Sequence, residues 1–547
     1  MIHQPLAYRG SRRSVVMAPN GMVASSQPLA VQAGVDILKS GGNAIDAAIA
    51  VNAVLGVVEP MSCGIGGDLF AIYWDAATKT LHGLNASGRA PYSANISAYR
   101  DEGLDAIPAR GPLSWSVPGC VDGWEAIRTR FGRLELEHIL SPAIEYAQHG
   151  FPVSDIIARD WGSSEELLGK WPGTAATFLP NGHAPKPGEV FRNPDLAKTY
   201  RRIAEGGRDS FYQGEIAEGI SACSSENGGF LSMRDLQDNT PTWDQPVSTN
   251  YRGFDLFELP PSGQGIAALQ MVNILEGYDL AFMGHNSADA LHYQIEAKKL
   301  AYADRSKYYA DPEFSDVPVE ELISKEYAER QRARIDKHRA SMDVPPGHPA
   351  MVHGDTAYLT VVDKDRNAVS FIQSLFMGFG SGVVAPGLGF PMQNRGQLFA
   401  LDESHANALV PHKRPFHTII PAMVMKDGKP FLSFGLMGGD MQPQGHTQIM
   451  CNLIDFGMDI QEAGDADRFN HSGSATPTGV PMDSRGGTVD IEPGVLDEVI
   501  EELSRRGHVM NRTWQGFGGY QAILIDPLNA MLHGASEPRK DGCAIGF

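Results

Sequence analysis

The sequence predicts an α+β fold in which stacked antiparallel sheets are covered by helices. The first observation is a set of strand pairs joined by short polar turns, the pattern of antiparallel hairpins. The predicted pairs are 70–74 with 80–84, 358–363 with 368–374, 419–425 with 431–435, and 519–526 with 531–535. The second observation is that helical patterns separate these pairs along the chain. Because strands come from both ends of the sequence, the sheets must be assembled from distant segments.

The predicted helices begin near the N-terminus. Ser26-Gln27-Pro28 caps a helical pattern that runs to Lys39, and Gly41-Gly42 ends it. Asn43 opens a second helix, 44–54, whose only charge is Asp46, so we expect it to be buried on most sides. Further helical patterns cover about 119–130, 135–148, 287–306, 317–338 and 494–506. The stretch 340–354 contains several helix breakers and is predicted to be an exposed, mobile loop.

Composition limits the kinds of partner. The chain has 547 residues, 42% of them hydrophobic and 20% charged, as in compact globular proteins. Its formal net charge is −20, from 65 acidic against 45 basic residues, and the basic residues are not clustered. A nucleic acid would be repelled by this charge, so we expect no nucleic-acid partner.

The cysteines and the N-terminal segment bear on the compartment. The five cysteines show no C-x-x-C spacing and are too sparse for a disulfide scaffold, so reduced thiols are expected. Arg12 and Arg13 are not followed by an apolar run of about 7–15 residues, so no secretory signal is visible. No apolar stretch reaches about 18 residues, so no membrane span is expected. These features predict a cytoplasmic enzyme-sized protein.

Several familiar catalytic motifs are incomplete. The loop Cys63–Asp68 resembles a phosphate loop, but it lacks both the G-x-G-x-x-G pattern and a Walker lysine, and a strand follows it. No G-x-S-x-G elbow is present. His405, His412 and His417 lack the H-E-x-x-H pattern, so solvated loop histidines are favoured over a metal site. We therefore expect no metal and no cofactor.

The hydroxyl of Thr356 is the remaining candidate nucleophile. It lies at the start of a predicted strand, directly after the predicted exposed loop. A threonine with a free α-amine carries its own base, with a pKa of about 7.7–8.0, within reach of its hydroxyl. Cleavage before Thr356 would create this arrangement. The alternative is an ordinary β-branched residue that begins a strand.

Several motifs in order connect the chain to one family. They are Gly41–Ala48, Glu59-Pro60, Gly64–Asp68, Ala303-Asp304-Arg305, Asp311-Pro312, Asp355–Asp365 and Gly534–Arg539. From about Ser26 to the C-terminus, the chain resembles the gamma-glutamyltranspeptidase family of N-terminal nucleophile hydrolases. Asp355–Asp365 is the most specific motif, since it matches the start of the family's small subunit.

The resemblance implies a proenzyme with a four-layer αββα sandwich. Self-cleavage between Asp355 and Thr356 would divide the chain into a large subunit, residues 1–355, and a small subunit, residues 356–547. Together they would form one globular unit, a heterodimer; whether such heterodimers pair further stays open.

The resemblance also implies roles for individual residues. Thr356 would be the nucleophile, and Ser374 the second hydroxyl that orients it. Gly438 and Gly439 match the backbone oxyanion hole, and two N–H groups at that position can stabilise the charge that acyl transfer creates. Arg89 matches the arginine that holds the substrate carboxylate, for which its planar fork is suited.

The chain departs from the family where the transpeptidases hold the α-ammonium of a γ-glutamyl donor. The family's amide and acid positions fall on Phe376 and Leu398, and another polar position falls on Arg395. An ammonium facing these residues would be desolvated without a partner. The neighbouring Asn394 is a further candidate contact.

The carboxylate side of the site and the lid also differ. His417-Thr418 stand where the family usually has two serines, and the stretch 398–413 is shorter than the lid loop of the transpeptidases. A shorter lid implies a more open pocket, which fits hydrolysis better than retention of an acyl-enzyme for transfer.

The expected function is an autoprocessed amidohydrolase that hydrolyses, or transfers, an acyl group bearing a carboxylate, such as γ-glutamyl from glutathione. One alternative is an amide hydrolase of the oxamate or glutaryl type without γ-glutamyl specificity. Another is an unprocessed, catalytically silent binding protein of the family. The expected partner is a small-molecule amide, with neither nucleic acid nor membrane involved.

Overall fold

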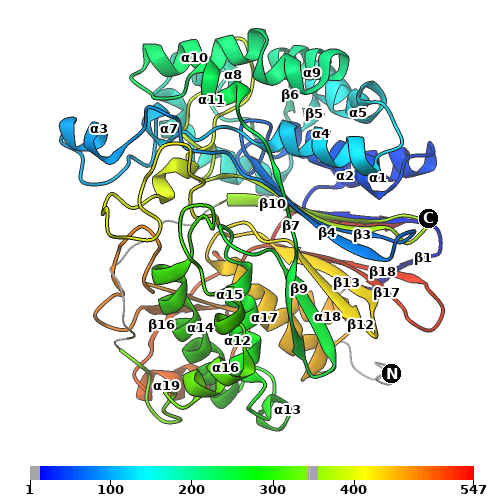
Figure 1. Ribbon diagram of the computed structural model, residues 1–547. Helices are drawn as coiled ribbons and strands as arrows, with labels where there is room; N and C mark the ends of the chain where they lie inside the picture. The colour runs from blue at the N-terminus through cyan, green and yellow to red at the C-terminus, as the bar shows by residue number, and fades with distance from the viewer. Residues whose placement is uncertain (1–12, 343, 345–354) are drawn as a thin grey trace.

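Two seven-stranded antiparallel sheets form the centre of the molecule (Figure 1). The structure is a computed structural model, which describes residues 13–342, 344 and 355–547. Sheet A has the order β1 (Val16–Ala18), β18 (Leu532–Ser536), β17 (Tyr520–Ile525), β13 (Lys429–Leu436), β12 (Ala422–Lys426), β9 (Phe254–Glu258) and β8 (Val247–Tyr251). Sheet B has the order β19 (Cys543–Gly546), β2 (Met22–Ser25), β10 (Asp355–Val362), β11 (Ala368–Phe376), β3 (Asp68–Asp75), β4 (Thr80–Ala86) and β7 (Thr242–Asp244).

All four predicted hairpins are present, as β3–β4, β10–β11, β12–β13 and β17–β18. Both sheets also join the two ends of the chain, because β1 pairs with β18 and β2 pairs with β19. Two small sheets lie outside the sandwich. They are β5 (Phe151–Pro152) with β6 (Val190–Phe191), and β14 (Phe469–Ser472) with β15 (Thr488–Ile491) and β16 (Val509–Arg512).

Helices cover the outer face of each sheet, which completes the predicted αββα order (Figure 1). The layer on sheet B is built on α1 (Pro28–Lys39), α2 (Ala44–Val58), α4 (Cys120–Phe131), α5 (Leu136–His149), α9 (Pro194–Tyr212) and α10 (Glu215–Glu226). The layer on sheet A is built on α12 (Gly265–Leu275), α14 (Ala288–Tyr308), α16 (Lys325–Arg332), α17 (Met441–Ile454) and α18 (Ile460–Asp465). A third apolar cluster, with Phe70, Ile72, Tyr358 and Met423, fills the space between the sheets.

Shorter elements complete the chain. They are α3 (Ile96–Asp101), α6 (Asp155–Gly162), α7 (Glu165–Gly169), α8 (Pro172–Phe178), α11 (Met233–Gln237), α13 (Leu280–Met283), α15 (Val319–Leu322), α19 (Asp497–Arg505), and the 3-10 turns η1 (Pro112–Ser114) and η2 (Arg395–Leu398). No helix in the described part of the chain is long and apolar enough to cross a membrane.

One predicted helix was wrong in extent. The pattern over 317–338 forms two helices, because α15 ends at Leu322 and Ser324 caps the start of α16, its hydroxyl accepting from the Tyr327 N–H (3.1 Å). The predicted loop 340–354 lies mostly outside the described residues.

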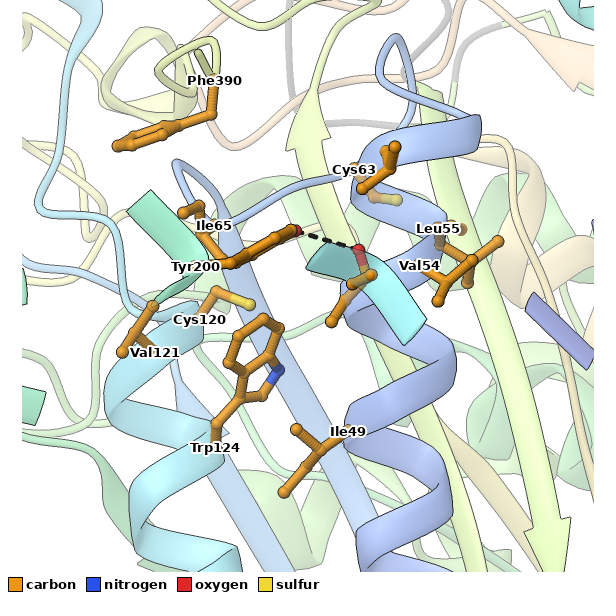
Figure 2. Close-up of a cluster of buried hydrophobic side chains, with 14 of the residues drawn as sticks. Ile49, Val54, Leu55, Cys63, Ile65, Cys120, Val121, Trp124, Tyr200 and Phe390 are labelled. Atoms are coloured by element: carbon orange, nitrogen blue, oxygen red, sulfur yellow. Dashed lines mark hydrogen bonds between the residues drawn. The ribbon is translucent and has the colours of Figure 1, made fainter. Parts of the chain in front are cut away.

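Helix α2 is buried along its whole length, as its composition predicted. Asn43 and Asp46 form a capping box at its start. In Figure 2 its side chains meet those of α4 and α9, and the Tyr200 hydroxyl donates to the Ala53 carbonyl (2.9 Å). The Trp124 indole N–H donates to Asn52 Oδ1 (2.8 Å). The helix therefore packs against the outer face of sheet B, where it contacts β10 and β11.

Candidate active site

Thr356 lies beside an irregularity in sheet B. Asp355 pairs with Phe376, whereas Ala357 pairs with Gln373, so β11 contains one extra residue opposite Thr356. Such bulges change the direction of side chains and are frequent next to active sites. The Thr356 hydroxyl donates to Ser374 Oγ (3.3 Å), and Thr356 is only 1% exposed. The two predicted hydroxyls are thus brought together.

Ser374 is held from two further sides. Its Oγ accepts from the Phe376 N–H (2.8 Å), and on the other side it pairs with Asp68 of β3. The glycine-rich loop before Asp68 packs against the same strand, because a Cβ at Gly67 would lie 2.3 Å from the Ser374 carbonyl oxygen. The loop that resembled a phosphate site therefore supports the end of β11, and its glycine permits the close approach.

Asp68 connects the strands to the loop before β12. Its Oδ2 accepts from His417 Nε2 (2.7 Å), and its Oδ1 accepts from the Gly88 N–H (2.8 Å) and from Gln393 Nε2 (3.0 Å). His417 Nδ1 accepts from the Ile419 N–H (3.5 Å), which places the ring proton on Nε2. Burial and the nearby Arg395 lower the pKa of His417 to about 4 despite the bond to Asp68, so the ring is neutral.

Arg395 is completely buried beside this aspartate. Its Nη1 donates to Thr418 Oγ1 (2.7 Å), and its guanidinium carbon lies 4.8 Å from the centre of the Phe376 ring. Its Nε is 3.8 Å from Asp68 Oδ2, too far for a hydrogen bond. Within the described part of the chain, neither Nε nor Nη2 has a hydrogen-bond partner. Burial lowers the pKa of Arg395 to about 9, so the guanidinium stays charged at neutral pH.

Gly438 and Gly439 form the turn between β13 and α17. Both have positive φ, 114° and 59°, a conformation that favours glycine. No hydrogen bond between described residues uses the N–H of either glycine. The pair therefore offers two free backbone donors at the start of a helix, where partial positive charge accumulates.

The register between the sheets places this turn near Thr356. Thr360 Oγ1 donates to Ser433 Oγ across the sandwich (2.7 Å). Two residues further, a Cβ at Gly435 would lie 2.4 Å from the Tyr358 ring. Side chains on one face of a strand recur at every second residue, so the next position on this face of β10 is Thr356. It lies opposite the residues that follow β13, and the glycine pair is among them.

A buried polar network braces the glycine turn. Gln264 Nε2 donates to the Gly439 carbonyl (2.9 Å) and to the Thr418 carbonyl (2.7 Å), so it joins two parts of the site. The Arg305 Nη1 donates to Gln264 Oε1 (2.6 Å) and to Asp440 Oδ1 (2.5 Å). Gln264 was not predicted as a site residue. Arg305 was noted only as part of a family motif, without a role.

Arg89 is placed differently from Arg395. Its Nη2 donates to Glu313 Oε1 (2.8 Å), and its Nη1 donates to the His412 carbonyl (3.1 Å) and lies 3.9 Å from Asp311 Oδ2. Among the described residues, no hydrogen bond joins Arg89 to Thr418, the other residue predicted on the carboxylate side of the site. Its charge is balanced by acidic neighbours of the same chain.

The other predicted contacts are buried in protein. Asn394 Nδ2 donates to the Ala109 carbonyl (2.7 Å), and its Oδ1 accepts from the Met377 N–H (3.2 Å), so its amide is already bonded. Leu398 and Phe376 belong to one apolar cluster. Both side chains are buried, and the Phe376 ring also faces the Arg395 guanidinium.

The three loop histidines do not converge. His417 bonds to Asp68, His405 Nε2 bonds to the Ser306 carbonyl (3.0 Å), and His412 stacks on Tyr92 with ring centres 4.5 Å apart. These separate environments do not form a shared metal site.

A cluster with metal-ligand spacing lies elsewhere among the described residues, at His292, Glu296 and His508. His292 Nδ1 and His508 Nε2 are hydrogen-bonded to each other (2.9 Å), and Glu296 accepts from Lys299 Nζ (2.9 Å). The ligand atoms are thus used within the protein, and the cluster serves as a buried polar network.

A cavity of about 730 Å³ lies beside the glycine turn. Gly438 and Gly378 contribute to its lining, as does Trp514, which is 81% exposed. The cavity gives a large group access to the turn from solvent.

The chain is similar to known proteins over almost its whole length. A family model described as Gamma-glutamyltranspeptidase matches residues 30–547. The glutathione hydrolase-like YwrD proenzyme of Bacillus subtilis (strain 168) is 40% identical over 536 residues, covering 97% of this chain and 99% of that protein. The oxamate amidohydrolase proenzyme of Klebsiella pneumoniae subsp. pneumoniae is 35% identical over 541 residues, covering 97% and 99%.

A solved structure agrees over the whole length. The crystal structure of cephalosporin acylase from Bacillus halodurans superposes with a TM-score of 0.90 at 44% identity, covering 100% of this chain and 99% of that chain. The family model spans most of the chain, and the relatives are matched almost end to end. The chain therefore belongs to the gamma-glutamyltranspeptidase family of N-terminal nucleophile hydrolases.

Proposed function

We propose that this protein is a proenzyme that cuts itself between Asp355 and Thr356 and then hydrolyses amides whose acyl group carries a carboxylate. The observation that carries the proposal is the position of Thr356, the second residue of the central strand β10, with its hydroxyl bonded to Ser374. The proenzyme names of the relatives support it.

In self-cleavage, the Thr356 hydroxyl attacks the carbonyl carbon of residue 355. The C–N bond breaks as an ester to the threonine oxygen forms, and water then opens this ester. The products are a new C-terminal carboxylate and a free α-amine on Thr356. That amine supplies the base that the intact chain lacks.

In amide hydrolysis, the α-amine takes the proton of the Thr356 hydroxyl while its oxygen attacks the substrate carbonyl. The N–H groups of Gly438 and Gly439 stabilise the resulting oxyanion, and the amine then gives its proton to the leaving nitrogen. Water hydrolyses the acyl ester and regenerates the threonine. Ser374 fixes the direction of the nucleophile throughout.

The two subunits, residues 1–355 and 356–547, stay together after the cut. Strand β10 of the small subunit lies between β2 of the large subunit and β11, which in turn pairs with β3. Sheet A is mixed in the same way, since β12 pairs with β9. Separation would therefore break both sheets.

The first test is electrophoresis and N-terminal sequencing of the purified protein. Of the total 59.1 kDa, fragments of about 38 and about 21 kDa are expected in proportion to their residues, the smaller beginning at Thr356. They should co-elute under native conditions. Fully active protein that remains a single full-length chain would contradict the proposal.

A further inference from the structure

The carbonyl groups of the glycine turn are hydrogen-bonded on the side of helix α17. The Gly438 carbonyl accepts from the Met441 N–H (3.1 Å), and the Gly439 carbonyl accepts from the Gln442 N–H (3.1 Å). In a trans peptide the N–H points away from the carbonyl. The Gly439 N–H shares its peptide with the Gly438 carbonyl, so it points away from the start of α17.

Two consecutive glycines do not hold this direction by themselves. Glycine adopts positive and negative φ about equally readily, and both residues have positive φ here. Donors to an oxyanion are effective only when their direction is fixed before the reaction. The two N–H groups therefore depend on neighbouring side chains that hold the turn in place.

Three fully buried side chains from the part of the chain before the proposed cut reach this turn. Gln264 Nε2 donates to the Gly439 carbonyl (2.9 Å). Arg305 holds the next side chain, because its Nη1 and Nη2 donate to Asp440 Oδ1 (2.5 Å) and Oδ2 (3.1 Å). The Tyr302 hydroxyl donates to the Asp440 carbonyl. The backbone that directly follows the glycine pair is thus held at three points.

Arg305 also sets the orientation of the Gln264 amide. Its Nη1 donates to Gln264 Oε1 (2.6 Å). Because a guanidinium has only donors, the glutamine must present its oxygen to Arg305, and its Nε2 then faces the Gly439 carbonyl. The guanidinium carbon lies 3.8 Å from the centre of the Tyr302 ring, which keeps the fork in place. A lysine has no such fork and cannot hold Gln264 and Asp440 in the same way.

We propose that Gln264, Tyr302 and Arg305 are positioning residues for the oxyanion. They fix the direction of the two glycine N–H groups without touching the substrate themselves. This inference rests on the proposed function. The three residues belong to the large subunit and the glycine turn to the small subunit, so oxyanion stabilisation in one subunit depends on hydrogen bonds from the other.

The proposal predicts an effect on kcat more than on KM. Formation and hydrolysis of the acyl ester both pass through an oxyanion, so kcat falls whichever step is slower. The bound substrate carries no such charge before the attack, so its affinity changes less. A defect that merely unfolds part of the protein would instead reduce the amount of active enzyme.

The chain offers a matched pair of control residues. Gln270 and Tyr309 are also buried, and their side chains are hydrogen-bonded to each other (2.5 Å) and, through Gln270 Nε2, to Asp304 (2.7 Å). The test compares Gln264→Met with Gln270→Met, and Tyr302→Phe with Tyr309→Phe. The measurements are kcat and KM for glutaryl- and γ-glutamyl-p-nitroanilide, normalised to the amount of small subunit, together with thermal melting.

We expect Gln264→Met to lower kcat about tenfold or more, with KM within about threefold of the wild type. Tyr302→Phe should lower kcat about threefold, a smaller effect because Gln444 Nε2 also donates to the Asp440 carbonyl (3.0 Å). It leaves the Gln264 bond to the Thr418 carbonyl intact, so it is the cleaner test of an unchanged KM. Both controls should melt earlier yet keep kcat within about twofold.

An aldehyde inhibitor gives a readout that a merely structural role would not change. In glutaric semialdehyde, the Thr356 oxygen adds to the aldehyde carbon, the hydroxyl proton passes to the α-amine, and the carbonyl oxygen becomes the oxyanion. Its inhibition constant should rise in Gln264→Met by about the same factor as kcat falls, while inhibition by glutarate stays within about threefold.

Equal kcat in Gln264→Met, Tyr302→Phe and their controls would overturn the inference while leaving the amidohydrolase in place. A loss confined to KM would overturn it as well. Absence of both self-cleavage and amide hydrolysis in the wild-type protein would instead overturn the proposed function.

Discussion

The substitution Gly438→Ala tests whether the glycine turn, Gly438-Gly439, stabilises the oxyanion. The structure gives the expected size of the loss in stability and in kcat. At a φ of 114°, an alanine is strained, and its Cβ would lie 3.2 Å from Met441 Cβ and 3.3 Å from Gly518 Cα. Neither neighbour is the flexible end of a side chain, so the turn itself must shift, at a cost of about 1–3 kcal/mol. A shift that removes one N–H from the oxyanion costs a further ~2.7–4 kcal/mol, or about 10²–10³-fold in kcat.

A matched control separates strain from catalysis. Gly428 also has positive φ, 73°, but it lies in the turn between β12 and β13, and a Cβ there would meet nothing within 4 Å. Gly428→Ala should lower stability by about 1–2 kcal/mol and leave kcat unchanged. The assay is release of p-nitroaniline from a p-nitroanilide substrate, normalised to the amount of small subunit, together with thermal melting of both variants.

The outcome that refutes the reasoning is specific. If Gly438→Ala melts earlier, as Gly428→Ala does, yet keeps kcat within threefold of the wild type, the glycine pair does not bind the oxyanion. A donor elsewhere would then have to be sought.

Three further predictions concern the nucleophile, acid stability and the core. Thr356→Ala should give only the full-length chain on a denaturing gel and no amidase activity, whereas Thr356→Ser should cleave slowly; normal turnover by the alanine variant would exclude Thr356. The pKa of His417, about 4 in the folded protein and about 6.5 unfolded, means that its stabilisation is complete above pH 6.5 and is lost as the pH falls toward 4, by about 3 kcal/mol. Thermal melting of His417→Gln should therefore depend less steeply on pH in this window, and equal slopes would contradict the assignment. Tyr200→Phe removes the donor to the Ala53 carbonyl and should cost about 1–3 kcal/mol of stability while kcat is retained; an unchanged melting temperature would show that water replaces the bond.

The layers of the fold could be predicted because their signals are local. Alternating hydrophobic and polar residues on either side of a polar turn identify a hairpin without any knowledge of distant residues. In the same way, Asn43 and Asp46 mark the start of α2. The strand order could not be predicted in this way. The pairing of β10 with β2 joins segments more than three hundred residues apart, and no local pattern records it. The break at Ser324 was missed because a capping serine also occurs inside helical patterns.

The residues of the candidate site also fall into two groups, those that could be predicted from the sequence and those that could not. The roles of Thr356, Ser374 and the glycine pair were predicted from the resemblance to the family, which aligns these positions in the sequence. Gln264 was missed because its role depends on two carbonyls far along the chain, those of Thr418 and Gly439. A glutamine between a loop and a helix has no distinctive sequence pattern. Only the folded structure reveals that Gln264 connects the glycine turn to the loop that contains Thr418.

Under the proposed function, the placement of Thr356 lets one cut activate the protein without dismantling it. Thr356 lies near the start of the inner strand β10, and the rest of this strand is fixed between β2 and β11. The strand pairs and the interlayer core that hold it are independent of the bond before Thr356, so they can form in the uncut chain. Cleavage then changes only the chemistry at the strand's first residues, where an amide nitrogen becomes a basic amine. The fold prepares the site, and the loss of one bond supplies the base that the site lacks.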